Sequence, residues 1–348
     1  LGWSVLRHAD VLDVLHDHET YRNRVSQYLS VPNGMDPPEH TPYRRLIEPY
    51  FGPEPIARFE PVCDTIATEL VTSIPRDCPI EVMDTIGHEF AVRIQCAFMG
   101  WSLDLHEPLR AWVHEQQRAT LAQDRKALAV SARRFDDVVA GVLATRRTAG
   151  TAAPDDPTTR LLHEVVDGRP LTDAEIVSIV RNWTVGELGT IAASVGIVVA
   201  YLAHHPEVEA QLRADSSAIP AAIDEILRID APLIANRRVT ARHVDLAGEP
   251  LPAGARVTVL WSSANRDERV FGEPDEFRLD RDPSSNLLYG AGIHVCPGAP
   301  LARLELRSFV TAFLAATERL RPELDPPPVR ATYPAGGYRS VWVVLDPA

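Results

Sequence analysis

The chain contains 348 residues, 45% of them hydrophobic, and carries a formal net charge of −13. This length allows a large buried core built as two packed lobes, and the acidic balance argues against general affinity for nucleic acid. The four cysteines have no CxxC spacing, so we expect free thiols, a reducing compartment and hence a cytoplasmic protein.

The first part of the chain is predicted to be mainly helical. Its opening, WSVLRHADVLDVL, begins as a strand and becomes helical at Ala9. It lacks the pattern of a signal peptide, and a start in mid-strand indicates that an amino-terminal portion is missing. A Pro-Pro turn in MDPPEHTPYRR precedes two helical stretches separated by FGPEP, and helical patterning then continues to about Arg147.

The second part combines one very long helix with short strands. After a predicted loop over 148–159, the pattern from Thr172 to His205 indicates a helix long enough to cross the molecule. No apolar run of about 18 residues lacks a polar interruption, so we expect no membrane anchor. Strands and turns dominate from Ala231, a last helix follows Cys296, and the tail reads as a closing hairpin or strand. We therefore predict a mainly α protein with a smaller β part, near 1–8 and 231–262, as a single domain over 1–348.

The stretch SNLLYGAGIHVCPGAPLARLELR places Cys296 in a glycine-rich turn that leads into a helix. Glycines there permit positive φ or close approach to a flat ligand. A helix start favours the thiolate over the thiol, and a buried thiolate needs a cation or a metal. The alternative, a buried core cysteine, suits Cys63, Cys78 and Cys96 better. A dinucleotide-binding loop is excluded, because the third glycine of GxGxxG falls on Val295.

The decapeptide YGAGIHVCPG resembles the haem-ligand loop of the cytochrome P-450 family. This resemblance implies that Cys296 ligates the iron of haem b (iron protoporphyrin IX). Four other positions match the family pattern: Gly290, Gly292, His294 and Gly298. Tyr289 departs from it, because phenylalanine is usual there. A thiolate axial ligand pushes electron density onto haem iron and favours O–O cleavage.

Further family motifs occur in the expected order. EILR matches the family's ExxR at Glu225 and Arg228, two side chains on one helical face. In PDEFRLDR, Arg281 resembles the third member of the family's structural ion network. The resemblance gives these three residues a scaffolding role.

Four basic residues fall at positions that bind the haem propionates in the family. DPPEHTPYRR resembles the helix at the haem edge and presents His40 and Arg44, four residues apart and so on one face. RRVTARHV supplies Arg238, and the cysteine loop supplies His294. Taken singly, each is more simply a solvated surface side chain.

The long helix departs from the family at the site of oxygen activation, where an acid and a threonine usually deliver protons. In NWTVGELGT, Thr190 takes the position of the family's threonine, and Gly186 takes the first small position beside the haem. Glu187 replaces the usual glycine, and Gly189 replaces the acid. Glycine has no side chain for a proton relay. Glu187 and Thr190 lie three residues apart, so a relay of Glu187, water and Thr190 is possible on one α-helical face. An alternative of equal weight is that Glu187 forms an ion pair with an arginine and has only a scaffolding role.

The resemblance implies a haem-thiolate monooxygenase that inserts one oxygen atom from O2 into a small hydrophobic or aromatic substrate by hydroxylation or dealkylation. Electrons come from NAD(P)H through a ferredoxin- or flavodoxin-type partner or a fused reductase, since NWTVGELGT is similar to haem domains fused to a flavin and iron–sulfur reductase. No nucleic-acid or membrane partner is expected. Two alternatives remain: a peroxide-driven oxygenase, motivated by Gly189, and a haem-binding ligand sensor without oxygenase activity.

Two surfaces are assigned by position. The short segment between Tyr21 and Asp36 indicates an open substrate pocket or absent residues, with apolar candidates at Leu233, Ile234 and 180–185. A basic patch for the electron-transfer partner is predicted on the cysteine side, formed by Arg44, Arg45, Arg303 and Arg307.

Overall fold

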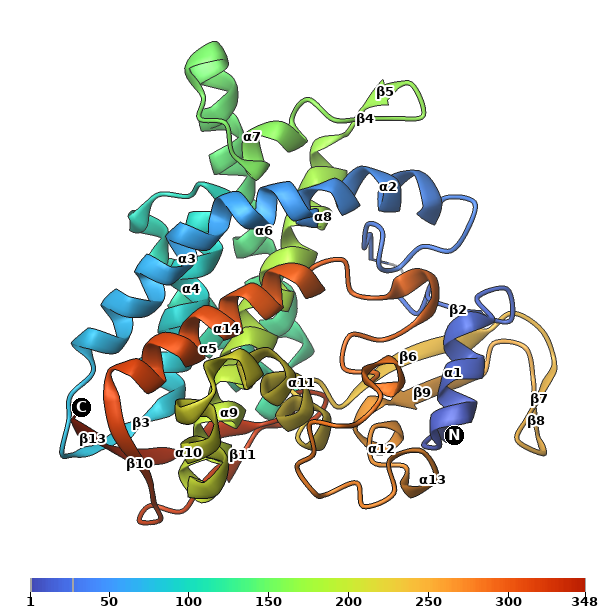
Figure 1. Ribbon diagram of the computed structural model, residues 1–348. Helices are drawn as coiled ribbons and strands as arrows, with labels where there is room; N and C mark the ends of the chain where they lie inside the picture. Colours follow the sequence, from blue (N-terminus) through green and yellow to red (C-terminus); the bar gives the residue numbers. More distant parts are fainter. Residues whose placement is uncertain (1, 27, 348) are drawn as a thin grey trace.

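The computed structural model describes residues 2–26 and 28–347. It is mainly helical, with a smaller β part, as predicted (Figure 1). The α-helices are α1 His8–His16, α2 His40–Ile47, α3 Pro53–Ser73, α4 His88–Met99, α5 His106–Leu121, α6 Arg125–Ala149, α7 Pro157–Leu161, α8 Asp173–Gly186, α9 Ala192–His204, α10 Pro206–Ala214, α11 Ile219–Ile229, α12 Trp261–Ala264, α13 Glu268–Phe271 and α14 Ala299–Ala315. Short 3-10 turns are η1 Glu48–Phe51, η3 Leu103–Leu105, η4 Gly150–Ala152, η6 Ser216–Ala218, η7 Pro283–Ser285 and η8 Gly292–His294, and π turns are η2 Met83–Gly87 and η5 Glu187–Ile191.

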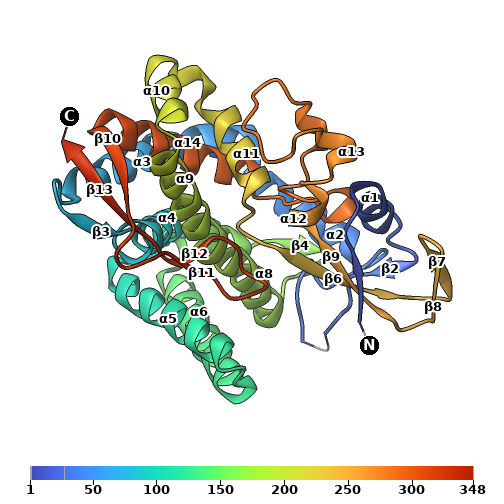
Figure 2. The ribbon, with the colours of Figure 1, turned by 90° about the horizontal axis from the view of Figure 1, so that it is seen from below.

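The strands form small sheets at two ends of the molecule (Figure 2). The four-stranded sheet has the order β1-β9-β6-β2 and consists of β1 Trp3–Val5, β9 Arg256–Leu260, β6 Ala235–Thr240 and β2 Tyr21–Arg22. The three-stranded sheet has the order β10-β13-β3, with β10 Thr317–Glu323, β13 Trp342–Pro347 and β3 Pro79–Glu81. Three two-stranded ribbons pair β4 Val165–Val166 with β5 Arg169–Pro170, β7 Val244–Leu246 with β8 Glu249–Leu251, and β11 Val329–Arg330 with β12 Tyr338–Ser340. The tail is thus a strand, as expected.

The predicted long helix crosses the centre of the molecule as α8, η5 and α9 (Figure 2). It begins with a capping box, in which the Thr172 hydroxyl accepts from the Glu175 amide and the Glu175 carboxylate accepts from the Thr172 amide. The prediction of one regular helix was wrong in its middle, because Glu187–Ile191 forms a π turn. By length and a mean hydropathy of 1.7 the segment Asp173–His204 could span a membrane, but 67% of its most apolar window is buried within the protein. It is therefore a core helix.

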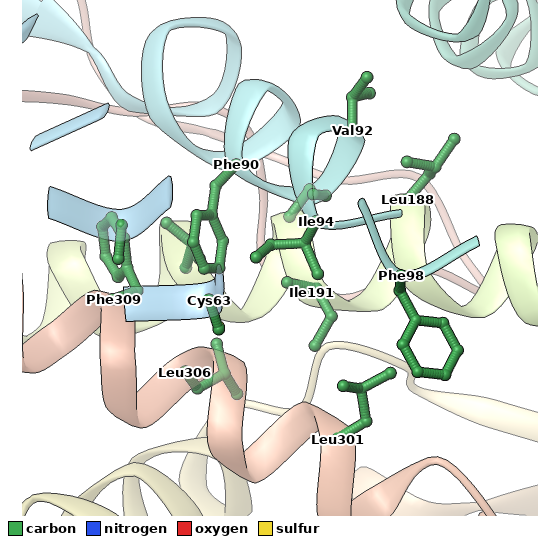
Figure 3. Close-up of a cluster of buried hydrophobic side chains, with 14 of the residues drawn as sticks. Cys63, Phe90, Val92, Ile94, Phe98, Leu188, Ile191, Leu301, Leu306 and Phe309 are labelled. Carbon is green, nitrogen blue, oxygen red and sulfur yellow. The ribbon is translucent and has the colours of Figure 1, made fainter. Parts of the chain in front are cut away.

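The hydrophobic core has a large and a small part. The large part lies among α3, α4, α9 and α14, and the small part lies between the four-stranded sheet and α1. Figure 3 shows side chains of the large part, including Phe90 from α4 and Phe309 from α14. Cys63 and Cys96 are fully buried there, whereas Cys78 is exposed, so the expectation of a core cysteine is wrong for Cys78.

The helices α3 and α14 lie side by side along one face of the molecule (Figure 1). At the start of α14, the turn η8 packs against α1. The loop that carries Cys296 is therefore held between the amino-terminal helix and the two helices of the core. This position makes it the natural starting point for the functional site.

Candidate active site

The cysteine loop is shaped by glycines with left-handed backbone conformations. Gly290 has φ of 73° and Gly292 has φ of 70°, which side chains disfavour. The Cys296 amide donates to the Tyr289 carbonyl at 2.9 Å and closes the loop. A Cβ atom on Gly292 would lie 2.3 Å from the Leu15 carbonyl oxygen. Gly292 therefore provides clearance for the end of α1, in contrast to the expected clearance for a flat ligand.

The Cys296 thiol lies just before the amino terminus of α14. The amides of Gly298 and Ala299 donate to its sulfur, which favours the thiolate. Pro300 occupies the first turn of α14, whereas Pro297 precedes the helix, so its predicted place in that turn was wrong. Burial nevertheless raises the pKa of Cys296. The thiolate needs a further positive centre.

The exposure of the Cys296 residue differs from the environment of its sulfur. Its residue surface is exposed, yet enough protein surrounds the sulfur for burial to dominate its pKa. The residue thus reaches the surface while its sulfur lies in a mainly protein environment. Among residues 2–26 and 28–347, no three His, Cys, Asp or Glu side chains gather as ligands of a metal ion.

A cluster of buried basic side chains lies beside the cysteine loop. The rings of His40 and His294 meet edge to face with centroids 4.4 Å apart, and neither buried Nε2 atom has a hydrogen-bond partner within the described residues. Arg238, 4% exposed, donates to the Arg237 carbonyl at 2.8 Å, and none of the described carboxylates forms an ion pair with it. A buried charge without a counter-charge is strongly destabilising. The cluster therefore fits an anionic ligand.

The protonation of this cluster supports the same conclusion. Burial, together with the charges of His40, Arg238 and Arg44, lowers the pKa of His294 to about 3. Burial and the Arg44 charge also lower the pKa of His40, and burial lowers that of Arg238 to about 10. At neutral pH both imidazoles are neutral, and each is free to donate one N–H to an acceptor. The guanidinium supplies the positive charge.

Arg44 connects α2 to the cysteine loop. Its Nη1 donates to the Val295 carbonyl at 2.7 Å, and its Nε lies 2.7 Å from Glu48 Oε1. The Arg44 charge also favours the Cys296 thiolate. The structure thus brings together all four predicted propionate-binding residues, with Arg44 turned toward the loop.

Tyr289, in the place of the family's phenylalanine, carries a buried hydroxyl. No described residue forms a hydrogen bond with this hydroxyl. The guanidinium of Arg303 lies 4.6 Å from the ring centroid, and burial raises the pKa of the phenol. The ring therefore packs well while its oxygen is left unsatisfied.

We expect Tyr289→Phe to raise the free energy of unfolding by about 1 kcal/mol, because an unsatisfied buried hydroxyl costs about 1–3 kcal/mol. Urea denaturation measures the difference. Tyr50→Phe is the matched control: its hydroxyl donates to Glu164 at 2.8 Å, so this variant should be less stable than the parent. A loss of stability in Tyr289→Phe equal to that in Tyr50→Phe would contradict the assignment.

Glu225, Arg228 and Arg281 form a buried ion network away from the cysteine. Arg228 donates from Nε and Nη2 to the two Glu225 oxygens at 2.8 and 2.9 Å, and Arg281 Nε lies 2.9 Å from Glu225 Oε1. Arg228 also donates to the carbonyls of Asn265 and Pro274. The network thus joins α11 to the loops that precede the cysteine loop.

The proposed oxygen site has an unexpected arrangement. The Thr190 hydroxyl donates to the Gly186 carbonyl at 2.7 Å, and no hydrogen bond links Glu187 to Thr190 in the part of the chain that the structure describes. The π turn spaces residues differently from an α-helix, so the same-face argument does not apply. A Cβ atom on Gly189 would meet nothing within 4 Å. The space beside Gly189, where the family's acid would project, is therefore open.

The carboxyl of Glu187 instead contacts Glu305 of α14. These two side chains are within hydrogen-bonding range of each other, and the scaffold alternative, an arginine partner for Glu187, finds no such pair among the described residues. Glu305 is not among the site residues predicted from the sequence. Its signal was an acid between Leu304 and Leu306 on the apolar face of a helix, LARLELR.

Similarity to known proteins identifies the class. Residues 101–332 match the sequence profile of the family described as Cytochrome P450. The chain is 31% identical to the Cyclomarin C epoxidase CymV of Salinispora arenicola, over 87% of this chain and 80% of that protein. It is also 31% identical to the erythromycin C-12 hydroxylase of Saccharopolyspora erythraea, over 93% of this chain and 84% of that protein. It superposes on the open structure of cytochrome P450 Eryk from S. erythraea with a TM-score of 0.90, at 28% identity, covering 100% of this chain and 91% of that one.

The fold is thus that of a haem-dependent monooxygenase. The chain belongs to the cytochrome P450 family. It is an oxidoreductase, and the family uses haem iron, dioxygen, electrons from redox partners and organic substrates.

Proposed function

We propose that Cys296 ligates the iron of haem b and that Arg238, His40 and His294 bind its propionates. The observation that carries this proposal is the buried Arg238 guanidinium without a described carboxylate partner, next to two imidazoles whose buried Nε2 atoms also lack partners. Two propionates would supply the missing acceptors and negative charges. The residues therefore fit the group that the family requires.

When bound, the haem supplies the redox chemistry that activates dioxygen. The chain's own residues hold and shield it. The amides of Gly298 and Ala299 stabilise the thiolate of Cys296, and Arg44 fixes the loop through the Val295 carbonyl. Hydrogen bonds to the sulfur restrain its electron donation and so tune the iron potential.

The proposed reaction is insertion of one oxygen atom into a small hydrophobic or aromatic substrate, by hydroxylation or dealkylation. The epoxidase and the hydroxylase among the relatives support this reaction type. Leu233 and Ile234 are partly exposed and remain candidates for the pocket wall. In the 180–185 segment, Val180 is completely buried and Val185 is half exposed, so Val185 is the more accessible candidate.

Electrons are proposed to come from NAD(P)H through a ferredoxin- or flavodoxin-type partner or a fused flavin and iron–sulfur reductase, in the cytoplasm. The predicted basic patch is largely neutralised in the structure. Glu48, Asp224 and Glu60 pair with Arg44, Arg303 and Arg307, and Arg45 is exposed without an ion pair among the described residues. We therefore expect a docking surface of mixed charge.

Labelled dioxygen tests this function. With NADPH, a ferredoxin and its reductase, we expect one atom of ¹⁸O from ¹⁸O₂ in the product of a substrate that changes the haem spin state. The second candidate, a peroxide-driven oxygenase, is favoured by the open space at Gly189. It predicts faster product formation with hydrogen peroxide than with the reductase system. Absence of product in both systems would instead support a ligand sensor.

A further inference from the structure

The buried face of α2 extends beyond the basic cluster and contacts a different part of the fold. His40, Tyr43 and Ile47 are buried on this face, three and four residues apart, as neighbours on one side of a helix are. His40 lies at the end beside the cysteine loop, where its ring meets that of His294. Tyr43 is not part of the basic cluster, yet polar groups from two other segments hold its hydroxyl.

The Tyr43 hydroxyl donates a hydrogen bond to Oε1 of Glu175, which lies in the first turn of α8. Both residues are buried, with 8% of each exposed. The same carboxylate belongs to the capping box of α8, because its Oε2 accepts from the Thr172 amide at 2.7 Å and from the Thr172 hydroxyl at 2.8 Å. One carboxylate therefore joins α2 to the start of the central helix.

Arg169 of the β4–β5 ribbon neutralises this carboxylate. The ribbon lies next to α2 (Figure 1) and turns at Asp167 and Gly168, whose φ angles of 49° and 78° suit a two-residue hairpin turn. Arg169 follows the turn directly. Its Nη2 donates to Glu175 Oε1 at 2.7 Å and its Nη1 to Oε2 at 2.9 Å. Its Nη2 also lies 3.1 Å from the Tyr43 hydroxyl oxygen, so the three side chains form one network.

The charges in this network fix the direction of the Tyr43 hydrogen bond. Hydrogen bonds from Arg169 lower the pKa of Glu175, so the carboxyl is ionised at neutral pH. Burial and the hydrogen bond to Glu175 raise the pKa of Tyr43, so the phenol keeps its proton. The phenol is therefore the donor and the carboxylate the acceptor. A hydrogen bond to a charged acceptor is stronger than one between neutral groups.

Tyr50 of η1 makes a comparable bond to the same part of the chain. Its hydroxyl donates to Glu164, just before β4, at 2.8 Å, and the Glu164 carbonyl accepts from the Leu171 amide. Tyr50 follows Tyr43 by about two helical turns, in the direction away from His40. The ribbon is thus bonded to the α2–η1 segment at two places, of which the Tyr43 site is the nearer to His40.

We propose that Tyr43 is a positioning residue for haem binding, which fixes the rotation of α2 about its axis and so holds His40 and Arg44 beside the cysteine loop. Side chains of one short helix move together when the helix rotates, so a fixed hydroxyl on its buried face also fixes the neighbouring turn. Arg44, the next residue, donates to the Val295 carbonyl of the cysteine loop at 2.7 Å. This inference rests on the proposed binding of the haem propionates.

Transfer of haem from the loaded protein to excess apomyoglobin tests this inference. We expect Tyr43→Phe, which removes only the hydroxyl, to release haem about tenfold faster than the parent, since groups that orient the ligands of a metal cofactor typically change its affinity by this factor or more. Tyr50→Phe is the matched control. It loses its bond to Glu164 and some stability, but should release haem at the parent's rate. An unchanged rate in Tyr43→Phe, or equal acceleration in both variants, overturns the proposal.

Resonance Raman spectroscopy of the haem-loaded protein distinguishes positioning from a general loss of stability. The bending bands of the propionates respond to the hydrogen bonds that these groups accept. We expect the bands to shift in Tyr43→Phe and to stay at the parent's positions in Tyr50→Phe. Unshifted bands in Tyr43→Phe would mean that α2 keeps its orientation without the hydroxyl, which contradicts the proposal.

A double-mutant cycle tests whether Tyr43 acts through Glu175. Glu175→Ala removes the acceptor of the same bond, so it should release haem about as fast as Tyr43→Phe. The double variant should be no faster than the faster single variant, because both changes remove one interaction. Acceleration factors that multiply in the double variant count against the proposal. If Glu175→Ala does not fold, Tyr43→Phe and Tyr50→Phe decide alone.

Arg238→Gln separates this inference from the proposed function. Arg238 is proposed to bind a propionate directly, so its replacement should accelerate haem release more than Tyr43→Phe does. If Arg238→Gln accelerates release and Tyr43→Phe does not, positioning by Tyr43 is overturned while the propionate assignment stands. If Arg238→Gln releases haem at the parent's rate, the propionate assignment itself fails, and the positioning role of Tyr43 fails with it.

Discussion

Cys296→Ser is expected to abolish the thiolate-type Soret band of the reduced, carbon monoxide-bound protein and, with it, monooxygenase turnover. A serine hydroxyl does not ionise at neutral pH, so it cannot replace a thiolate that donates electron density to iron. The amides of Gly298 and Ala299, which stabilise the sulfur anion, would then face a neutral hydroxyl. The absorption spectrum of the reduced protein under carbon monoxide measures the change.

The matched control is Cys78→Ser. Cys78 is exposed and lies far along the chain from the cysteine loop, so its replacement should leave the band unchanged. Retention of the thiolate-type band in Cys296→Ser, or its loss in Cys78→Ser, would disprove the assignment of the iron ligand. Haem content is measured in parallel, so that a shifted band is distinguished from a lost cofactor.

Arg228→Ala is expected to lower the free energy of unfolding by about 3–5 kcal/mol. The Arg228 side chain is 1% exposed and donates to Glu225 and to two backbone carbonyls. Its removal leaves the buried Glu225 charge with Arg281 as its remaining ion-pair partner among the described side chains. Guanidinium chloride denaturation of the haem-loaded protein measures the loss.

Arg134→Ala provides the comparison for Arg228→Ala. Arg134 pairs with Glu115 at 3.0 Å on the surface, where its side chain is 64% exposed. An exposed pair contributes about 0–1 kcal/mol, since water competes for both charges. If the two substitutions lowered the free energy of unfolding equally, the buried Glu225 network would contribute no more to stability than an exposed ion pair.

The predictable part of the structure was local in sequence. The mainly α architecture, the helix after Cys296 and the terminal strand follow from periodicity and turn residues, and the glycine pattern around Cys296 is typical of the family. The roles of Thr190, Glu187, His40 and Arg238 stay predictions, although the structure gathers the basic residues beside the cysteine loop. These positions depend on motif spacing that the fold preserves.

The features that escaped prediction depend on contacts between distant segments. The contact of Glu187 with Glu305 requires the docking of the central helix on α14, which no local pattern specifies. The π turn at Glu187–Ile191 likewise has no separate periodicity signal, because one irregular turn is short compared with the whole helix. The ion pairs that neutralise the predicted basic patch could not be predicted for the same reason, since Arg307 pairs with Glu60, which is far away in sequence.

The π turn also sets the rotational phase of the central helix. One extra residue in a turn rotates all following side chains by about 100° around the helix axis. The turn therefore separates two surfaces of different character: α8 carries polar contacts such as Asn182 with the Val31 carbonyl, whereas α9 is buried over almost its whole circumference. Two helical segments of different phase are thus joined without a break, and the acid Glu187 stands at the junction, where the phase changes.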